Sequence, residues 1–305
     1  MNNRYAAYIG VLAAVSAGIL WGFLGPAVRY CMEIGLTPMQ MTWLRYIVVT
    51  LILLIYAFVF KRDELKTNHF QIGIFIVMAV VGVMLNSTLY FQSMLMIPLS
   101  MSTVLQYLAP FIVIALSIPL FREKASKTKI AAVITAFIGC ILCTGLITEP
   151  GSMNIEGIAL GALSGFCYAT YILCSKRLSR DGCTPTTILL YTSIICTICF
   201  IPICDAPGAI SVVGSSLSNL MIIILFGILL TLVPFWLFNY SLEKIDAGKS
   251  SIITFVEPLV ATLLGFVIYG ETLTVEAVIG MVMIASALIM VSRNVPSGED
   301  PNGVS

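Results

Sequence analysis

Apolar runs separated by short polar segments recur along the whole chain. Ten of these runs are about 20 residues long, which is the length that a helix needs to cross the hydrocarbon core of a bilayer. They cover residues 6–28, 39–60, 71–95, 99–121, 129–148, 156–175, 186–204, 217–242, 248–269 and 274–292. The pattern therefore predicts an all-α integral membrane protein with ten transmembrane helices, followed by a polar cytoplasmic tail at 294–305 that we expect to be disordered.

The positive charges lie almost entirely on one side of the predicted membrane. With a cytoplasmic N-terminus, 14 of the 16 Lys and Arg residues fall in cytoplasmic segments, and only Arg29 and Arg45 lie toward the other side. Cytoplasmic loops of membrane proteins carry such an excess of Lys and Arg. The distribution predicts a multi-pass protein of the cytoplasmic (inner) membrane with an even number of spans and both termini in the cytoplasm.

The composition supports a membrane protein and excludes several other classes. Hydrophobic residues make up 59% of the chain and charged residues 10%, so lipid must serve as its solvent. The net charge of +1 gives no reason to expect a nucleic-acid partner. Most of the nine cysteines fall in apolar runs, and the single histidine, His69, lies in a polar loop. We expect buried thiols, no metal site and no cofactor.

Two stretches of the first half reappear in the second half at nearly the same spacing. The segment "WGFLGPAVRYCMEIGLTP" (21–38) aligns with "YATYILCSKRLSRDGCTP" (168–185) at an offset of 147, and 93–123 aligns with 241–271 at an offset of 148. Each half holds five spans, an odd number, so the second half must cross the membrane in the opposite sense. We predict two inverted five-helix repeats, residues 1–150 and 151–293, as in secondary transporters.

The chain resembles the ten-helix, EamA-type transporters of the drug/metabolite transporter superfamily. The resemblance covers nearly the whole chain and rests on the five-plus-five repeat and on "WG" in the first span. It rests further on "EP-x11-GE" from Glu257 to Glu271, with "P…RE" as its counterpart in the fourth span. The resemblance implies the carriage of small metabolites, often amino acids or related compounds, outward across the membrane.

Polar and aromatic residues recur at helical spacing in the middle of equivalent spans, where they share a helix face. Pro110 and Pro258 leave the carbonyls of Gln106 and Thr254 without their usual donors. In a membrane such a carbonyl must be covered by protein or face a watery cavity. We therefore predict a central substrate cavity, suited to an amphipathic small solute. Its predicted lining residues are Trp21, Asn86, Tyr90, Gln106, Tyr107, Tyr168, Tyr171, Trp236, Asn239, Tyr240, Thr254 and Glu257.

Glu257 is the residue on which the predicted mechanism depends. Ionisable groups within membrane spans usually serve function, so we expect this carboxyl to meet a cationic or amine-bearing substrate and to link proton release to substrate binding. The matching slot of the first repeat holds Ala109, so only one repeat carries the charge. The alternative is a protonated packing carboxyl. Two roles stay open for Arg45, which could snorkel outward or draw in an anionic substrate group.

Other residues near the span ends are interpreted as structural. Glu123 and Glu271 close the fourth and ninth spans next to Ser126 and Thr274, where we expect them to cap or anchor the following helix. Glycines recur along the first and sixth spans at 18, 22 and 25 and at 157, 161 and 165. Such rows of small residues favour close helix packing over ligand contact.

These observations predict a secondary active exporter of small metabolites such as amino acids that works by alternating access. The alternative within transport is an antiporter of the phosphorylated-sugar or nucleotide-sugar type, which should hold its phosphate with deeply placed Lys and Arg; only Arg45 qualifies. An enzyme is disfavoured because the chain lacks HExxH and G-x-S-x-G motifs, and it lacks a nucleotide-binding loop for ATP. The expected partners are a small-molecule substrate and the bilayer. An internal repeat can complete a pathway in a monomer.

Overall fold

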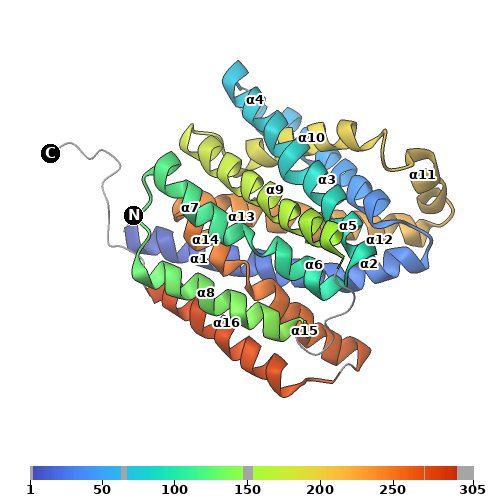
Figure 1. Cartoon of the computed structure of the whole chain (residues 1–305). Coiled ribbons are helices and arrows are strands. Elements are labelled where there is room, and N and C mark those ends of the chain that lie inside the picture. The colour runs from blue at the N-terminus through green and yellow to red at the C-terminus, as the bar shows by residue number, and fades with distance from the viewer. Residues whose placement is uncertain (1–2, 63–66, 147–153, 271, 294–305) are drawn as a thin grey trace.

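The computed structural model of the chain describes residues 3–62, 67–146, 154–270 and 272–293, and these residues form a bundle of helices without a strand (Figure 1). The first half contains α1 (Asn3–Gly22), α2 (Leu24–Glu33), α3 (Pro38–Phe60), α4 (His69–Val77), the π-helical segment η2 (Met78–Leu85), α5 (Asn86–Met96), α6 (Leu99–Gln106), α7 (Ala109–Phe121) and α8 (Lys127–Cys143). The second half contains α9 (Ile155–Arg180), α10 (Pro185–Phe200), α11 (Ala206–Gly214), α12 (Leu217–Gly227), the π-helical segment η3 (Ile228–Leu232), α13 (Val233–Lys244), α14 (Ala247–Ile253), α15 (Val256–Tyr269) and α16 (Val275–Arg293).

Each of the ten predicted spans corresponds to one helix or to consecutive helices, which confirms the all-α membrane fold. Among the described residues, eight helical segments are long and apolar enough to cross a membrane, and α10 is a shorter apolar helix. The fifth span is α8, with 17 residues. The apolar pattern does not predict α11, because its nine residues are too few to span a membrane. The predicted end of the fifth span at 147–148 and the tail at 294–305 lie outside the described residues.

Equivalent helices of the two halves start with the same local signals. Thr37 caps α3 and Thr184 caps α10, each by accepting a hydrogen bond from the backbone N–H three residues later. The turn before each cap contains a glycine with positive φ, +92° at Gly35 and +87° at Gly182. Other residues rarely adopt this left-handed conformation. The two turns therefore match at the predicted offset of 147 in backbone geometry as well as in sequence.

The interrupted spans of the two halves are also alike. The fourth span is broken between α6 and α7 and the ninth between α14 and α15, while the third and eighth spans contain η2 and η3. Ahead of the breaks, the Ser93 and Ser102 hydroxyls share a hydrogen bond of 2.9 Å. Their counterparts 148 residues later, Ser241 and Ser250, share one of 3.0 Å. The chain is thus built from two inverted five-helix repeats; the division at residue 150 stays a prediction.

The first helix of each repeat packs against the third and fourth spans of the other repeat. α1 lies against α13, α14 and α15, and α9 lies against α5 and α6. Glycine permits this approach: a Cβ at Gly10 would lie 3.2 Å from the Ile245 side chain, and one at Gly157 would lie 2.9 Å from that of Ile97. Added Cβ atoms would also meet neighbouring atoms at Gly18, Gly22, Gly161 and Gly165, whereas nothing lies within 4 Å of one at Gly25.

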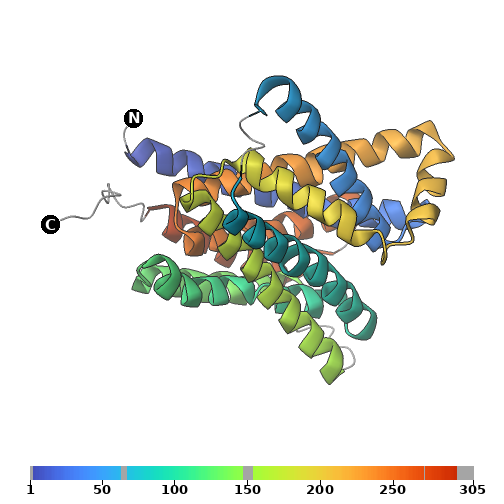
Figure 2. The same cartoon turned by 90° about the horizontal axis from the view of Figure 1, so that it is seen from above.

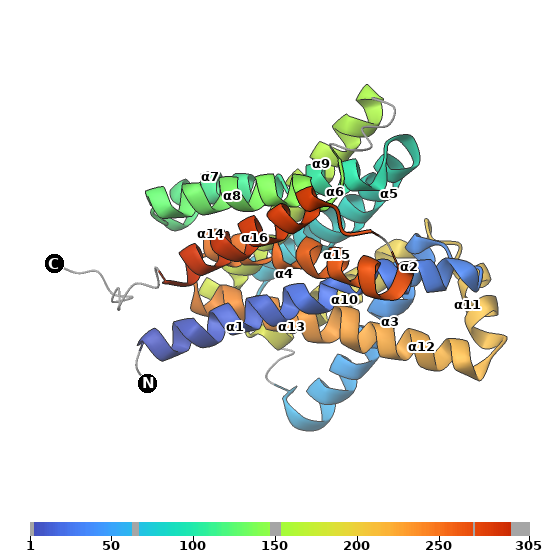
Figure 3. The same cartoon turned by 90° about the horizontal axis from the view of Figure 1, so that it is seen from below.

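Different helices lie along the edge and at the two ends of the bundle. α8 and α16, the last helices of the two repeats, lie side by side along one edge (Figures 1 and 3). α11 lies between α10 and α12 at one end of the bundle (Figure 2). The start of α1 and the end of α16 lie together at the opposite end (Figure 1). An even number of crossings requires this placement, and the assignment of that end to the cytoplasm stays a prediction.

Candidate functional site

Glu257 lies in the first turn of α15, directly after the break that separates α14 from α15. Pro258 has no N–H to offer the carbonyl of Thr254, and the Glu257 N–H bonds to that carbonyl instead, at 2.9 Å. The equivalent carbonyl of Gln106 is covered by α9, where a Cβ at Gly165 would lie 3.1 Å from it. Protein therefore covers both carbonyls that the prolines leave without their usual donors.

Tyrosines from three other helices gather around the Glu257 carboxyl. Tyr90 of α5, Tyr107 at the end of α6 and Tyr168 of α9 all lie within electrostatic range of it, and Tyr107 lies directly beside it. The Tyr107 hydroxyl is buried and has no hydrogen-bond partner among the described residues. Its ring stacks on Phe255 at 4.8 Å between centroids. The structure thus brings together predicted site residues from both repeats.

Hydrogen bonds hold the remaining polar residues of this group in place. Gln106 Nε2 donates to Asn86 Oδ1 at 3.1 Å, which joins α6 to α5. The Tyr90 hydroxyl shares a hydrogen bond of 2.9 Å with the Thr103 hydroxyl. Thr254 lies against the Tyr168 hydroxyl and is itself buried. The group is not sealed throughout, because five of its members keep partial accessibility. These are Asn86, Tyr90, Gln106, Tyr168 and Glu257.

Trp21, Tyr171 and Asn239 form a second, fully packed group. Asn239 Oδ1 accepts hydrogen bonds from the Tyr171 hydroxyl (3.2 Å) and from the Ser175 hydroxyl (2.6 Å), while its Nδ2 has no partner. Trp21 and Tyr171 both meet the Phe235 ring edge-on, at 5.1 and 5.3 Å. Trp21 is 6% exposed and Tyr171 1%. In this structure all three residues therefore act in core packing.

Trp236 and Tyr240 form a third group on a more exposed flank of α13. Their rings stack at 5.6 Å, and the Trp236 Nε1 donates to the Thr186 hydroxyl at 3.1 Å. The Lys244 ammonium lies 5.1 Å from the Tyr240 ring. Trp236 is 37% exposed, whereas Asn239 on the same helix is fully buried. The twelve predicted residues thus divide into three groups, and Glu257 belongs to the first.

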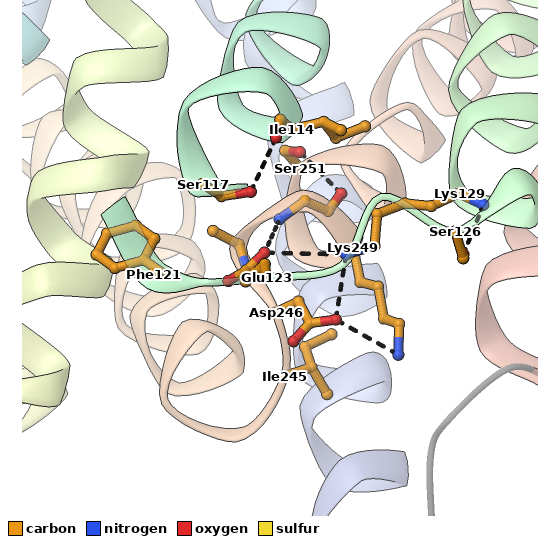
Figure 4. Close-up of polar contacts among 12 residues, drawn as sticks. Ile114, Ser117, Phe121, Glu123, Ser126, Lys129, Ile245, Asp246, Lys249 and Ser251 are labelled. Atoms are coloured by element: carbon orange, nitrogen blue, oxygen red, sulfur yellow. Dashed lines mark hydrogen bonds and ion pairs between the residues drawn. The ribbon is translucent and has the colours of Figure 1, made fainter. Parts of the chain in front are cut away.

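The sequence does not predict a cluster of charges, three of them buried, at the end of the bundle that holds the start of α1 (Figures 1 and 4). Lys129 Nζ lies 3.3 Å from Asp246 Oδ2 and 3.9 Å from Glu123 Oε2, and Lys249 Nζ lies 3.6 Å from Asp246 Oδ2. Glu123 and Lys129 belong to the first repeat, and Asp246 and Lys249 to the second. We call these four residues the inter-repeat clamp.

Glu123 also bonds to backbone of the other repeat, which corrects the expectation that it caps the following helix. Its two carboxylate oxygens accept from the N–H groups of Ala247 (2.9 Å) and Gly248 (3.4 Å) at the start of α14. Ser126, rather than Glu123, caps the following helix, α8. These partners lie 124 and 125 residues away in sequence, so no local pattern could have revealed them. Glu271, the counterpart of Glu123, lies outside the described residues.

The charges of the clamp act on one another. Burial alone raises the pKa of Asp246, but the nearby Lys129 and Lys249 ammonium groups outweigh burial and hold that pKa below its usual value of 3.8. Close by, Lys176 Nζ donates to the carbonyls of Leu242 (2.6 Å) and Ile245 (2.8 Å), which anchors the end of α13 to α9. The clamp contacts join the two repeats at this end of the bundle, and the Lys176 contacts join two helices of the second repeat.

Neither a metal-binding group nor the hollow beside α4 contributes to the candidate site among the described residues. Among the described residues, no group of three or more His, Cys, Asp or Glu side chains could hold a metal ion. A hollow of about 360 Å³ lies between α4 and α9, but it contains none of the predicted site residues. Its lining residues are His69, Phe70, Gly73, Ile74, Val77 and Cys174.

Comparison with known proteins places both halves in one family. The family model described as the EamA-like transporter family matches residues 8–145 and again residues 155–293. An uncharacterized transporter of Archaeoglobus fulgidus is 29% identical over 276 residues, which cover 90% of this chain and 95% of that protein. The threonine/homoserine exporter RhtA of Salmonella typhimurium is 27% identical over 202 residues, or 65% of this chain and 64% of RhtA.

A solved crystal structure has the same fold. It matches with a TM-score of 0.75 at 17% sequence identity and covers 92% of this chain and 95% of that chain. At this identity the likeness concerns the fold alone.

Proposed function

The chain belongs to the EamA-like transporter family, and from this premise we propose that it is a secondary active exporter of small metabolites, amino acids among them, that works by alternating access in the cytoplasmic membrane. That it is a multi-pass membrane transporter for a small molecule, and not an enzyme, follows from the family. The direction of transport, the substrate class, the mechanism and the orientation of the termini are the proposal.

The observation that carries the proposal is the Glu257 carboxyl with the tyrosines around it. A carboxyl in a membrane bundle is costly unless it serves a polar partner. An ammonium group bound here would pair with Glu257 and donate hydrogen bonds to the hydroxyl oxygens of Tyr90, Tyr107 and Tyr168. The carboxyl can also carry a proton, so binding of an amine can displace it. Proton movement would thereby be coupled to substrate movement.

Alternating access is supported by the inter-repeat clamp. Transport requires that the central site open first to one side and then to the other, commonly by movement of one repeat against the other. The clamp joins the repeats at one end through ion pairs and through Glu123, which bonds to the α14 backbone. Breaking these contacts would free that end. The name of RhtA, a threonine/homoserine exporter, supports amino acids as the first class to test and export as the direction.

Transport by the purified chain in liposomes tests the proposal. Standard amino acids, purines and phosphorylated sugars are offered singly, with and without a pH gradient across the liposome membrane. We expect uptake of an amino acid that responds to the gradient. Uptake of phosphorylated sugars instead would favour the antiporter alternative, and uptake of none of these compounds would contradict the proposed substrate class.

Replacement of the carboxyl tests the role of Glu257. We expect Glu257→Gln to lower substrate affinity by about 10- to 100-fold, because a hydrogen bond to a charged group is worth about 1.5–3 kcal/mol. The remaining transport should lose its response to pH. Glu156→Gln is the matched control, because Glu156 is exposed in the first turn of α9. If the two variants share the wild-type affinity and pH profile, Glu257 is a packing residue.

A further inference from the structure

Lys176 and Arg29 occupy equivalent positions in the first spans of the two repeats. They lie 147 residues apart, which is the offset of the repeat match that contains them. Lys176 is buried, and its Nζ donates to the carbonyls of Leu242 and Ile245 at the end of α13. Carbonyls at the end of a helix lack donors within the helix and carry partial negative charge, so a cation stabilises them. The second repeat thus holds the end of α13 with a cation from its first span.

The first repeat contains the same acceptor at the end of α5. Met94 and Ile97 are the counterparts of Leu242 and Ile245, 148 residues earlier. Ile97 ends α5 with φ −136° and ψ 162°, and Ile245 ends α13 with φ −132° and ψ 169°. Pro98 has no N–H, so the Met94 carbonyl lacks the donor that a continuing helix would supply. The end of α5 therefore offers a cation the same pair of carbonyls in the same local backbone geometry.

Arg29 lies over a different helix in this structure. It is exposed, and its guanidinium is 4.2 Å from the centroid of the Tyr269 ring of α15. Its own helix, α2, has its main contacts with α1 and α3, whereas α9 packs directly against α13. α9 is unbroken, but in the first repeat Pro26 leaves the Gly22 carbonyl without its usual donor, and the span divides into α1 and α2. Arg29 is therefore carried by a short separate helix that does not pack on α5 as α9 packs on α13.

The exposure of the residues that follow these helix ends differs in the same sense. Leu99, at the start of α6, is 52% exposed, and its counterpart Ala247, at the start of α14, is fully buried. The helix end to which Lys176 bonds is thus enclosed, and the equivalent end in the first repeat is not. Because the repeats are equivalent, each can adopt the arrangement that the other has here, and an exchange of the two arrangements opens one end and closes the other.

We propose that Arg29 is the positioning residue that closes the α5 end of the bundle. On closure its guanidinium leaves the Tyr269 ring and donates to the carbonyls of Met94 and Ile97, as Lys176 does at the end of α13. This inference rests on the proposed function, because it requires alternating access. The guanidinium has five N–H donors and can reach both carbonyls at once. Lys176 then stabilises the state seen here, and Arg29 stabilises the opposite state. The rival role for Arg29 is an anchor at the membrane interface.

Thiol labelling at Ala247→Cys in the purified, otherwise cysteine-free chain tests this role. Position 247 is buried in the present state, and after the exchange it takes the exposure that Leu99 has now, so its labelling rate follows the population of the opposite state. We expect Arg29→Gln to slow the labelling by about 10- to 100-fold and Lys176→Gln to speed it by a similar factor, as loss of hydrogen bonds from a charged group predicts. A loosened fold would expose the thiol, so misfolding cannot produce the slower labelling.

Three controls accompany the measurement. Arg177→Gln removes an exposed cation next to Lys176 and should leave the labelling at position 247 unchanged. Thr272→Cys, an exposed reporter, should be labelled at one rate in every variant. A chain that keeps only the buried Cys140 should stay unlabelled in Lys176→Gln, which shows that the bundle is not loosened as a whole. Arg29→Lys should keep the wild-type rate, because a lysine makes this contact in the second repeat.

The outcomes separate this inference from its premise. If Lys176→Gln speeds the labelling at position 247 and Arg29→Gln leaves it unchanged, Arg29 is an interface anchor and its proposed role is overturned. Equal slowing in Arg29→Lys and Arg29→Gln also overturns it, and no change in either the Arg29 or the Lys176 variants overturns the exchange itself. Labelling needs no substrate, so a chain that transports no amino acid in liposomes contradicts the proposed substrate class and leaves the result on Arg29 intact.

Discussion

α6 and α14 are counterparts in the two repeats, and their surroundings differ. Every residue of α14 is buried, and Glu123 of the other repeat bonds to the N–H groups at its start. In α6 only Ser102 and Val104 are buried, Leu99 is 52% exposed, and no side chain caps its start among the described residues. The helix that precedes the break is thus enclosed by protein in the second repeat and more exposed in the first. Two similar halves can therefore hold different states at one time.

The break that follows each of these helices differs in chemistry as well. The ninth span continues with Phe255, Val256 and Glu257, whereas the slot equivalent to Glu257 holds Ala109. Tyr107, the counterpart of Phe255, lies beside the Glu257 carboxyl. The repeat supplies the shared frame of the site, and the differences between the copies supply its charge.

The prediction with the largest expected effect concerns the opposite orientations of the two repeats in the membrane. Lys124 and Thr272 are equivalent positions of the two repeats, 148 residues apart, and both are exposed. In a cysteine-free background, we expect an impermeant thiol reagent on intact cells to label Thr272→Cys fully and to spare Lys124→Cys until the cells are opened. Labelling of both positions from the same side would show that the repeats are not inverted.

The prediction with the next largest effect concerns the stability that the inter-repeat clamp provides. Glu123→Gln keeps an acceptor for the α14 backbone but removes the charge beside Lys129, whose side chain is 5% exposed. Because Lys129 keeps Asp246, we expect a loss of about 1–3 kcal/mol in the free energy of unfolding, measured by thermal denaturation in detergent. The control is Glu276→Gln, which changes an exposed acid of α16. Equal unfolding temperatures for the two variants would mean that the clamp does not stabilise this end.

The smallest expected effect is the pH dependence of the stability that the inter-repeat clamp provides. The pKa of Asp246 is lower in the folded protein than its usual value of 3.8, so its stabilising contribution is present above that value and is lost as the pH falls below it. We expect the unfolding temperature of the wild type to fall more steeply than that of Asp246→Asn between about pH 5 and pH 3. The difference should be small, because the Asp246 side chain is 39% exposed and solvent screens it. Parallel curves of unfolding temperature against pH would mean that the Asp246 carboxylate does not stabilise the clamp.

The sequence predicts the fold well because its signals are local or periodic. Apolar run length gives the ten spans, and the match between Gly35 and Gly182 or between Ser93 and Ser241 reveals the repeat. The short helix α11 is missed, because a nine-residue helix at the end of a bundle leaves no membrane-length signal. The lengths of the runs do not reveal which surfaces of the two repeats meet.

The candidate site is predicted only in part for the same reason. Helical periodicity identifies the polar faces that carry Tyr90, Tyr107 and Glu257, and the structure places these residues together. It cannot tell a face that lines a pathway from one that packs in the core, so Trp21 and Tyr171 are grouped with them. The clamp is not predicted at all, because its members are ordinary charges near the ends of spans until the fold brings residues 117 or more apart in sequence into contact.

The single carboxyl at Glu257 has a consequence for the ancestry of such carriers. In an assembly of two identical five-helix chains, symmetry would fill every slot twice, so a carboxyl at one slot would face its own copy across the axis. Two like charges at close range in a medium of low polarity repel each other, and they could not present opposite ends to an asymmetric molecule. Joining the copies into one polypeptide removes this constraint. One half can then keep an alanine while the other gains a charge, and the pathway can distinguish the head of its cargo from the tail.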